Sequence, residues 1–411
     1  YSGFSMDLCA GDWTEGFVAR LTSEEGRYFR YAKGLTDRGT IAHECLPQYS
    51  FPNLCAISID GTNNTQLTFL NKDEINSEPV INDRGQIVFR CKNGDGFPQA
   101  CAINDFNSDI VNLSERFGIE LVFDVDMNDH GVIAMSCQLP EGGDDLCVID
   151  LESDSFNVLT DLPDILGTGV SDPSINNNNL IAYRCLESFD SNICVFNVDG
   201  TDRDVLTKAG DNDDFFSATI NDHNQIAFSC EFESSVRNVC LIDLEKNLSH
   251  VTTDASLLET LYNDPHISNA GRISMNCTET TESESFYSVC SVNSDGTDFV
   301  NHGADSTGSF VTNDSAITDE NVVLYACPSA QDGSADICVM RPNENGSWSE
   351  SRIVWNWHAL DPSINNRGEV AFRCTDLQGN HNICYHNLVT GESQQLTFLD
   401  QRGEVGDIAS Q

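Results

Sequence analysis

The stretch INNNNLIAYRCLESFDSNICVFNVDGTDRDVLT, residues 175–207, recurs in altered form seven more times along the 411-residue chain. Each copy has an Asn- and Asp-rich segment, an apolar run that ends at a first cysteine, and a second cysteine about ten residues later. The first cysteines recur at a regular spacing, at positions 45, 91, 137, 185, 230, 277, 327 and 374. A repeat of this length is typical of propeller blades or of helical arrays.

The turn residues of each copy favour propeller blades. Segments such as Asn-Asp-Arg-Gly and Asn-Asp-His-Gly tolerate a positive φ, and the apolar run that follows predicts a hairpin instead of a helix start. A second turn, written SIDGT or NVDGT, follows in several copies. Each repeat thus predicts four strands: A ends at the Asn-Asp turn, B ends at the first cysteine, C begins at the second cysteine, and D ends in Leu-Thr. Such a unit buries both faces only when stacked on others, which predicts an all-β propeller of eight four-stranded blades.

The repeat pattern also resembles a known family. An Asn/Asp-rich turn, a strand such as Ile-Ala-Phe, and a closing Val-Asp-Gly-Thr…Leu-Thr are similar to the TolB-type, WD40-like (PD40-like) propeller repeats. The resemblance covers nearly the whole chain and implies the propeller fold. It implies no single activity, because that superfamily includes scaffolds, binding modules, peptidase gates and polysaccharide lyases. The paired cysteines depart from the usual repeat.

The two cysteines of each repeat are expected at the end of strand B and the start of strand C, on either side of a short loop. Antiparallel neighbours across such a loop can lie at disulfide distance. Seventeen cysteines without a Cys-x2-Cys spacing favour disulfides in an oxidising compartment over zinc sites. We predict eight pairs: Cys45 with Cys55, Cys91 with Cys101, Cys137 with Cys147, Cys185 with Cys194, Cys230 with Cys240, Cys277 with Cys290, Cys327 with Cys338, and Cys374 with Cys384.

Cys9 is left over. Its context, LCAGDWTEGFVARLT, matches LCAISIDGTNNTQLT (residues 54–68) in its opening, its close and its spacing, which predicts strands C and D of a ninth, incomplete repeat. We expect a single propeller domain over 1–411, with this half-repeat and a first strand in 1–33, eight repeats in 34–398, and a closing or exchanged strand in 399–411. Either the termini latch and close the ring with Cys9 unpaired, or the next molecule completes the half-repeat with Cys9 in an intermolecular bond.

Charge and composition limit the partners. The balance of 65 acidic against 21 basic residues gives a net charge of −44, which repels nucleic acid and anionic lipid. No apolar run approaches a membrane span, and Tyr1 follows no apolar leader, so we expect a mature, secreted or cell-surface chain that does not insert into membranes. Expected partners are another copy of the chain, an extracellular protein or a glycan. Six candidate N-glycosylation sites fit that compartment: Asn63, Asn112, Asn247, Asn276, Asn313 and Asn345.

Histidines and tryptophans are the first residues to consider for chemistry. His43 takes a strand position that is apolar in the other repeats, so it is predicted to be packed. His266 and His358 lie near the start of strand A, where propeller loops approach the axis, and are the histidines to test for catalysis. Trp355 and Trp357 suit either stacking on a sugar ring or packing between blades.

Charged side chains suggest two further features. The acidic side chains of the loop GDNDDF (residues 210–215) are expected to be solvated, with a calcium site as the alternative; its weak candidate ligands are Asp211, Asp213 and Asp214. No other cofactor is expected. Three arginines precede first cysteines and are predicted to form ion pairs with neighbouring blades: Arg90, Arg184 and Arg373.

These features predict a structural or binding role outside the cell, including that of a head-to-tail subunit of a surface or fibrous assembly. The alternative is a polysaccharide lyase or glycosidase on a propeller scaffold. An enzyme needs an acid, a base and a charge stabiliser that converge on one face of the ring. The eight repeats are so similar in sequence that no single blade stands out as the source of these three groups. This similarity favours the non-enzymatic interpretation.

Overall fold

A computed structural model describes residues 9–12, 17–20, 35–45, 53–62, 65–68, 77–93, 95–104, 108–140, 142–160, 169–187, 190–210, 213–232, 236–252, 260–280, 285–305, 315–329, 334–343, 346–354, 358–375 and 381–397. The chain divides into two compact units, residues 1–30 and 31–411. In the first unit, β1 (Cys9–Asp12) and β2 (Phe17–Arg20) form an antiparallel hairpin in which Cys9 lies opposite Arg20.

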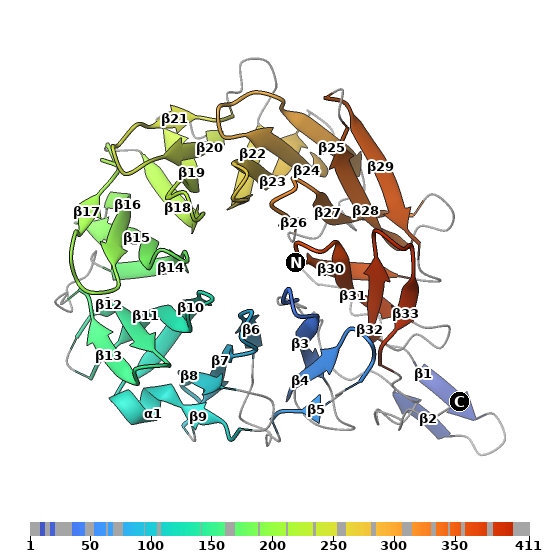
Figure 1. Ribbon diagram of the computed structural model, residues 1–411, viewed down its shortest axis with the longest axis horizontal. Helices are drawn as coiled ribbons and strands as arrows, with labels where there is room; N and C mark the ends of the chain where they lie inside the picture. The colour runs from blue at the N-terminus through green and yellow to red at the C-terminus, as the bar shows by residue number, and fades with distance from the viewer. Residues whose placement is uncertain are drawn as a thin grey trace. The chain divides into compact units, whose positions relative to one another are not determined.

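The second unit is an eight-bladed β-propeller, as predicted, and each sheet follows chain order from the axis outward (Figure 1). Blade 1 contains β3 (Thr40–Cys45), β4 (Asn53–Ser58) and β5 (Thr65–Gln66), with an isolated bridge between Leu35 and Ile41 in the place of strand A. Blade 2 contains β6 (Ser77–Ile81), β7 (Ile87–Lys92), β8 (Pro98–Ile103) and β9 (Val111–Asn112), followed by helix α1 (Leu113–Phe117); blade 3 contains β10 (Leu121–Met127), β11 (Val132–Gln138), β12 (Asp144–Asp150) and β13 (Ser155–Val158); blade 4 contains β14 (Gly169–Ile175), β15 (Leu180–Glu187), β16 (Asp190–Asn197) and β17 (Asp204–Val205).

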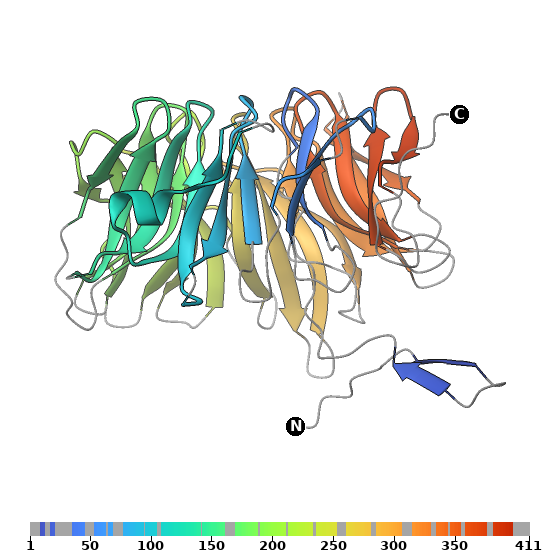
Figure 2. The ribbon, with the colours of Figure 1, turned by 90° about the horizontal axis from the view of Figure 1, so that it is seen from below.

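The other four blades repeat the pattern. Blade 5 contains β18 (Asp214–Ile220), β19 (Ile226–Phe232), β20 (Val236–Ile242) and β21 (Ser249–His250); blade 6 contains β22 (Thr260–Ile267), β23 (Arg272–Thr280), β24 (Ser285–Asn293) and β25 (Val300–Asp305); blade 7 contains β26 (Ala316–Ile317), β27 (Val323–Pro328), β28 (Ala335–Pro342) and β29 (Trp348–Ile353); blade 8 contains β30 (Ala359–Ile364), β31 (Glu369–Thr375), β32 (His381–Asn387) and β33 (Ser393–Gln395). The short hairpin turns between strands line one face of the ring (Figure 2).

Strands B and C of each blade are buried on both faces, because neighbouring blades cover them. Successive residues of β11 and β12 are buried almost without a break. This explains why the sequences of these strands are continuous apolar runs and do not alternate between apolar and polar residues. Between blades 4 and 5, for example, Ile193 and Val195 pack with Phe215 and Phe228. His43 is only 4% exposed within β3, the packed position that its place in the repeat predicts.

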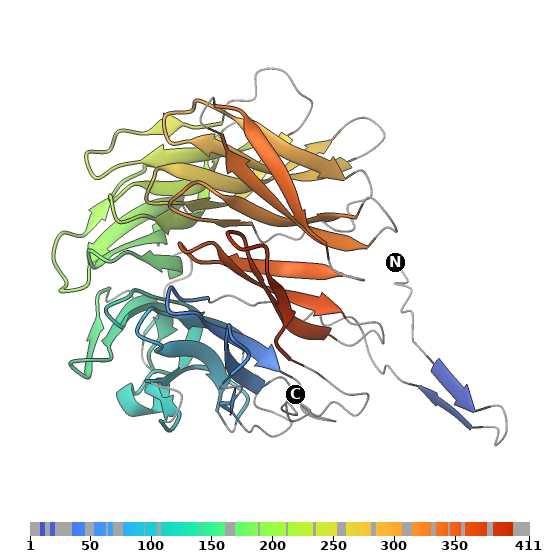
Figure 3. The same cartoon turned by 45° about the vertical axis from the view of Figure 1, so that its right-hand side comes forward.

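The ring closes between the first and the eighth repeat. Leu35, Ile41 and Ile57 of blade 1 form one buried cluster with Ile383 and Leu396 of blade 8, and Figure 3 shows these blades side by side. Among the described residues, every sheet of the ring is built from one continuous repeat, so closure needs no strand exchange. Residues 399–411, predicted to close the ring or to exchange, lie outside the described part.

Seven disulfides clamp strands B and C. The cysteines lie diagonally across the ladder instead of directly opposite, since Cys137 faces Asp145 while Cys147 faces Met135, and every Cα–Cα distance is 5.8 to 6.0 Å. Cys55 is also disulfide-bonded, whereas the side chains of Cys45 and Cys9 lie outside the described residues. The seven pairs are Cys91–Cys101, Cys137–Cys147, Cys185–Cys194, Cys230–Cys240, Cys277–Cys290, Cys327–Cys338 and Cys374–Cys384.

Candidate functional site

The asparagine of the A–B turn both closes its own turn and joins the next blade. In blade 4, the side-chain oxygen of Asn176 accepts the N–H groups of Asn178 and Leu180, each at 3.0 Å. Its Nδ2 donates to the main-chain oxygen of Asn221 in blade 5 at 2.9 Å. The turn ends at Asn179 with φ 62°, a left-handed conformation that glycine or asparagine adopts at little cost, and the repeats use only these two residues there.

The next residue of each turn forms a closed ring around the axis. Its backbone N–H donates to the side-chain oxygen of the equivalent residue in the following blade, in eight hydrogen bonds of 2.7 to 3.2 Å. The last bond, from Asn366 to Asp37, spans the junction of blades 8 and 1. We call this set the axial ring; in chain order it is Asp37, Asp83, Asp129, Asn177, Asp222, Asn269, Asp319 and Asn366.

The axial ring lines a cavity of about 390 Å³ at the axis. The apolar residues just before the first residue of each A–B turn (an Asn, Thr or Ser) also line the cavity: Leu35, Ile81, Met127, Ile175, Ile220, Ile267, Ile317 and Ile364. The lining carries the five carboxylates of the ring and includes no Lys, Arg or His. This geometry concentrates negative charge at one point on the surface.

Asparagine and aspartate share the ring unevenly. Nδ2 of Asn177 donates to the carboxylates of both neighbours, Asp129 at 2.9 Å and Asp222 at 3.3 Å. Between blades 1 and 3, by contrast, Asp37, Asp83 and Asp129 follow one another with no amide between them. Burial raises the pKa of Asp83, and the charges of Asp129 and Asp37 raise it further. Asp83 therefore favours a proton or a positive group beside it.

A second set of acidic residues lies on the innermost strands. Asp172, Ser217, Asp264 and Asp361 occupy equivalent bulges of strand A with φ between 47° and 54°, a strained conformation for these residue types. Ser217 donates to Asp264 of the next blade at 3.3 Å. Desolvation raises the pKa of Asp172, and the charge of Asp124 adds to the effect. Three of these four equivalent positions therefore carry a carboxylate.

The structure does not bring the two candidate histidines into a common site. Nδ1 of His358 accepts the N–H of Ala335 at 3.1 Å, which ties blade 8 to blade 7. His266 lies in β22, opposite Ser274 of β23. Both histidines are half-buried, and Trp355 and Trp357 lie outside the described part of the chain.

Where it is described, the acidic loop 210–215 makes contacts within the protein. Asp213 accepts the N–H of Gly210 at 2.8 Å, and Asp214 pairs with Arg184 at 3.2 Å. Asp211 lies outside the described residues, and within them no group of three or more His, Cys, Asp or Glu side chains is placed to hold a metal ion.

The other two arginines that precede first cysteines also make contacts near the axis. Arg373 forms an ion pair with Asp361 of its own blade, with Nε and Oδ2 2.9 Å apart. Arg90 donates to the main-chain oxygen of Phe123 in the next blade at 2.6 Å. Of the three arginines, Arg184 therefore pairs with a neighbouring blade, as predicted, whereas Arg373 pairs within its own blade.

The three glycosylation candidates within the described chain differ in their surroundings. Asn247 is exposed in a turn of blade 5. Asn112 caps helix α1 by accepting the N–H of Glu115, and Asn276 lies within the central strand β23, where it contacts Asp264. Asn63, Asn313 and Asn345 lie outside the described residues.

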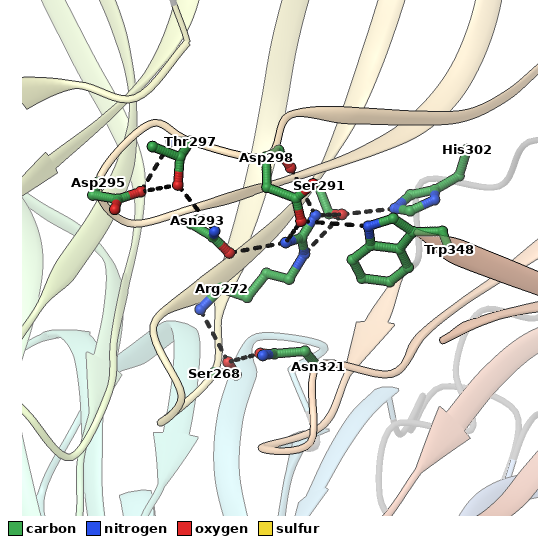
Figure 4. Close-up of polar contacts among 10 residues, drawn as sticks. All are labelled: Ser268, Arg272, Ser291, Asn293, Asp295, Thr297, Asp298, His302, Asn321 and Trp348. Atoms are coloured by element: carbon green, nitrogen blue, oxygen red, sulfur yellow. Dashed lines mark hydrogen bonds and ion pairs between the residues drawn. The ribbon is translucent and has the colours of Figure 1, made fainter. Parts of the chain in front are cut away.

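The repeat pattern did not predict a polar cluster around the buried Arg272 of blade 6. It joins Arg272, Ser291, Asp298 and His302 to Trp348 of blade 7 (Figure 4). We call these five residues the blade 6 cluster. Two departures from the repeat signal it: an arginine follows the turn glycine, and strand D reads FVNHGAD instead of ending in Leu-Thr.

Comparisons with known proteins support the fold. No protein-family model and no curated protein sequence matches the chain. Similar solved structures include oligogalacturonate lyase from Vibrio parahaemolyticus (TM-score 0.52, 11% identity, 84% of this chain and 95% of that chain) and dipeptidyl peptidase 4 from Porphyromonas gingivalis (0.58, 10%, 90% and 60%). A puromycin-hydrolyzing peptidase from Mycobacterium tuberculosis is similar as well (0.54, 12%, 89% and 58%). At these identities the likeness shows the propeller fold alone, the fold that the TolB-type resemblance implies.

Among the described residues no helix is long and apolar enough to cross a membrane. The disulfides indicate an extracellular or otherwise oxidising environment.

Proposed function

We propose that the chain is an extracellular, non-catalytic binding protein whose axial ring takes a ligand with positively charged groups. The observation that carries this proposal is the axial cavity, whose lining holds five carboxylates and no basic side chain. The ring atoms are held in place by hydrogen bonds around the whole circle, so the carboxylates are positioned before a ligand arrives. Such preorganisation lowers the cost of binding.

The negative charge of the axial ring also argues against the alternative function, that of a polysaccharide lyase or glycosidase. An oligogalacturonate chain carries carboxylates, and the five carboxylates of the ring repel them unless a cation lies between. His266 and His358, the candidate catalytic histidines, make separate backbone and strand contacts. A polysaccharide lyase or glycosidase therefore ranks second and is one outcome of the test below.

Self-association through residues 1–30 is a further proposal, and one observation favours it. In β1–β2, Cys9 lies opposite Arg20, just as Cys101 lies opposite Asn112 in blade 2, and the two pairs have the same spacing along the chain. The hairpin therefore has the register of strands C and D without strands A and B. Negative-stain electron microscopy of native and Cys9→Ser protein, without reducing agent, tests it: linked rings in the native protein that separate in the variant support assembly, and single rings in both refute it.

Binding at the axial ring is tested by calorimetric titration with spermidine, tetra-arginine and tetragalacturonate at low salt. We expect spermidine and tetra-arginine to bind, and we expect added salt to lower their affinity. Asp83→Asn removes one ring carboxylate and should weaken binding about fivefold, since one screened charge contact is worth about 1 kcal/mol. Asn177→Asp is the matched variant and should strengthen binding by a similar factor.

Three results overturn the binding proposal. One is the absence of cation binding, and another is equal affinity of both variants and the native protein. The third is conversion of tetragalacturonate to an unsaturated product, which would establish the enzyme instead.

A further inference from the structure

Arg272 is the fixed centre of the blade 6 cluster. Its side chain is 3% exposed, and its Cζ lies 4.2 Å from the ring centroid of Trp348. All five guanidinium N–H groups have acceptors. Nε and Nη2 donate to Ser291 Oγ at 3.0 and 2.8 Å, Nη1 donates to the side chains of Asn293 and Asp298 at 2.9 and 2.8 Å, and Nη2 also donates to the main-chain oxygen of Asp298 at 3.0 Å.

These contacts fix the proton on His302. Both acceptor positions of the Ser291 hydroxyl are filled by Arg272, so its own proton is left for Nε2 of His302, 2.7 Å away (Figure 4). A ring nitrogen that accepts a hydrogen bond carries no proton, so neutral His302 carries its proton on Nδ1. Nδ1 is buried without a hydrogen-bond partner among the described residues, and the residue is 6% exposed.

We propose that His302 is an acid-sensitive latch that holds the outer strand of blade 6 in place at neutral pH and releases it when the imidazole is protonated. Protonation turns Nε2 from an acceptor into a donor, which then faces Ser291 Oγ with both acceptor positions already occupied. It also places a second positive charge beside Arg272. Both effects break the hydrogen bond between Ser291 and His302.

Charged and titratable groups face the latch from each element around it. Arg272 comes from β23, Asp298 from the turn before β25, and Tyr325 from β27. Burial first, and then the charge of Arg272, lowers the pKa of His302 to about 4, while Asp298 opposes the shift. Burial raises the pKa of Tyr325, with Glu350 of β29 adding to the rise and Arg352 of the same strand opposing it. Tyr325 therefore stays protonated throughout the acid range, and His302 is the group that responds.

The strand that the latch holds is β25, the outermost strand of blade 6. Its pairing with β24 shifts register between the pair Ser288–Ala304 and the pair Cys290–Asn301, which places His302 in a bulge. Several side-chain contacts hold this bulge. The first is the hydrogen bond between Ser291 and His302, and the second is the hydrogen bond from the Tyr325 hydroxyl to the main-chain oxygen of His302 at 2.5 Å. Trp348 also packs against the His302 ring, with centroids 5.1 Å apart, and Asn301 accepts the N–H of Gly303 at 3.1 Å. Loss of the first therefore favours local opening of an edge strand.

Hydrogen exchange of the intact, oxidised chain tests the latch. If His302 regains an ordinary pKa in the open form, the opening equilibrium of residues 300–305 rises roughly 30-fold between pH 7.5 and pH 5, after correction for the intrinsic exchange rate. His302→Gln stays neutral, and its side-chain oxygen accepts from Ser291, so the rise should be absent. His386→Gln is the control, because His386 also contacts a serine, Ser393 at 2.7 Å, but belongs to blade 8.

A native protein without the rise, or a His302→Gln variant that keeps it, overturns the proposal. If the variant does not fold, nitrogen NMR of histidine-labelled native protein decides. We expect His302 to carry its proton on Nδ1 and to remain neutral at pH 5. The opposite tautomer, or titration near pH 6.5, refutes the latch.

Discussion

Asp83→Asn is the substitution that most directly separates the stability of the axial ring from its charge. The variant keeps the side-chain oxygen that accepts the N–H of Asp37 at 2.7 Å. It adds an amide that can donate to the carboxylates on either side, as Asn177 does at 2.9 and 3.3 Å. A hydrogen bond to a charged group contributes about 1.5–3 kcal/mol. Because the site is partly open to water, we reduce this and expect the variant to be about 1–2 kcal/mol more stable at pH 7.

The gain should depend on pH in a defined direction. The pKa of Asp83 is raised in the folded ring by burial and by Asp129 and Asp37. A carboxyl whose folded pKa is raised stabilises the fold most below its unfolded pKa, and that contribution is lost as pH rises through the folded pKa. An asparagine at this position does not titrate and has no such loss, so the advantage of Asp83→Asn should be largest at neutral pH and shrink toward acid.

Thermal unfolding of both proteins at several pH values measures this advantage. A melting temperature roughly 1–3 °C higher at pH 7, with a smaller difference in acid, is the expected result. A less stable variant, or a gain that does not change with pH, would refute the reasoning about the arc of three aspartates. If the variant is more stable but binds cations less tightly, then the carboxylate of Asp83 improves cation binding and lowers the stability of the fold.

Three further outcomes follow from the structure and are measured by denaturant unfolding. Asn365→Ala should cost more than Asn176→Ala by about 1 kcal/mol. Both variants lose the same turn bonds and one bond to a main-chain oxygen of the next blade, but the chain itself also joins blades 4 and 5, whereas it does not join blade 8 to blade 1. Arg373→Met should cost about 1.5–3 kcal/mol, since it removes the charge-assisted contact to a carboxylate that is 9% exposed. Replacing Cys230 and Cys240 together by alanine should cost about 2–3 kcal/mol through a looser unfolded state. Equal losses in the asparagine pair, or losses under about 1 kcal/mol in the other two, would contradict these assignments.

The sequence predicts the blades because each blade repeats the same local chemistry. The Asn-Asp turn, the apolar run and the cysteine spacing all act within a single repeat, so strands and disulfides can be placed from them. The axial ring cannot be predicted from a single repeat in this way. In the sequence, Asp83 looks like an ordinary turn residue. Its carboxylate accepts the N–H of Asp37 only because the fold brings the turns of successive blades to the same height on the axis.

The blade 6 cluster shows a different limit. Arg272 and His302 are visible as departures from the repeat, so the expectation that the repeats are evenly written was wrong at this blade. The departures alone do not predict the contact, because it also requires Trp348, which lies in the following blade. A changed residue in a repeat therefore marks a local departure in structure, but the residue that it contacts must be found in the structure.

The position of the junction between blades 8 and 1 explains why closure of the ring depends on side chains at the axis. When terminal strands share a blade, backbone hydrogen bonds hold the junction closed. Here the junction falls between two complete repeats, and every disulfide among the described residues of the ring, with sequence separations from 9 to 13, lies within one blade. The disulfides therefore stabilise blades but not the closure, which rests on the cluster around Leu35 and on the bonds from Asn365 to Thr36 and from Asn366 to Asp37. An aspartate or asparagine in every turn is then a structural requirement, and the choice between the two is left free to set the charge of the cavity.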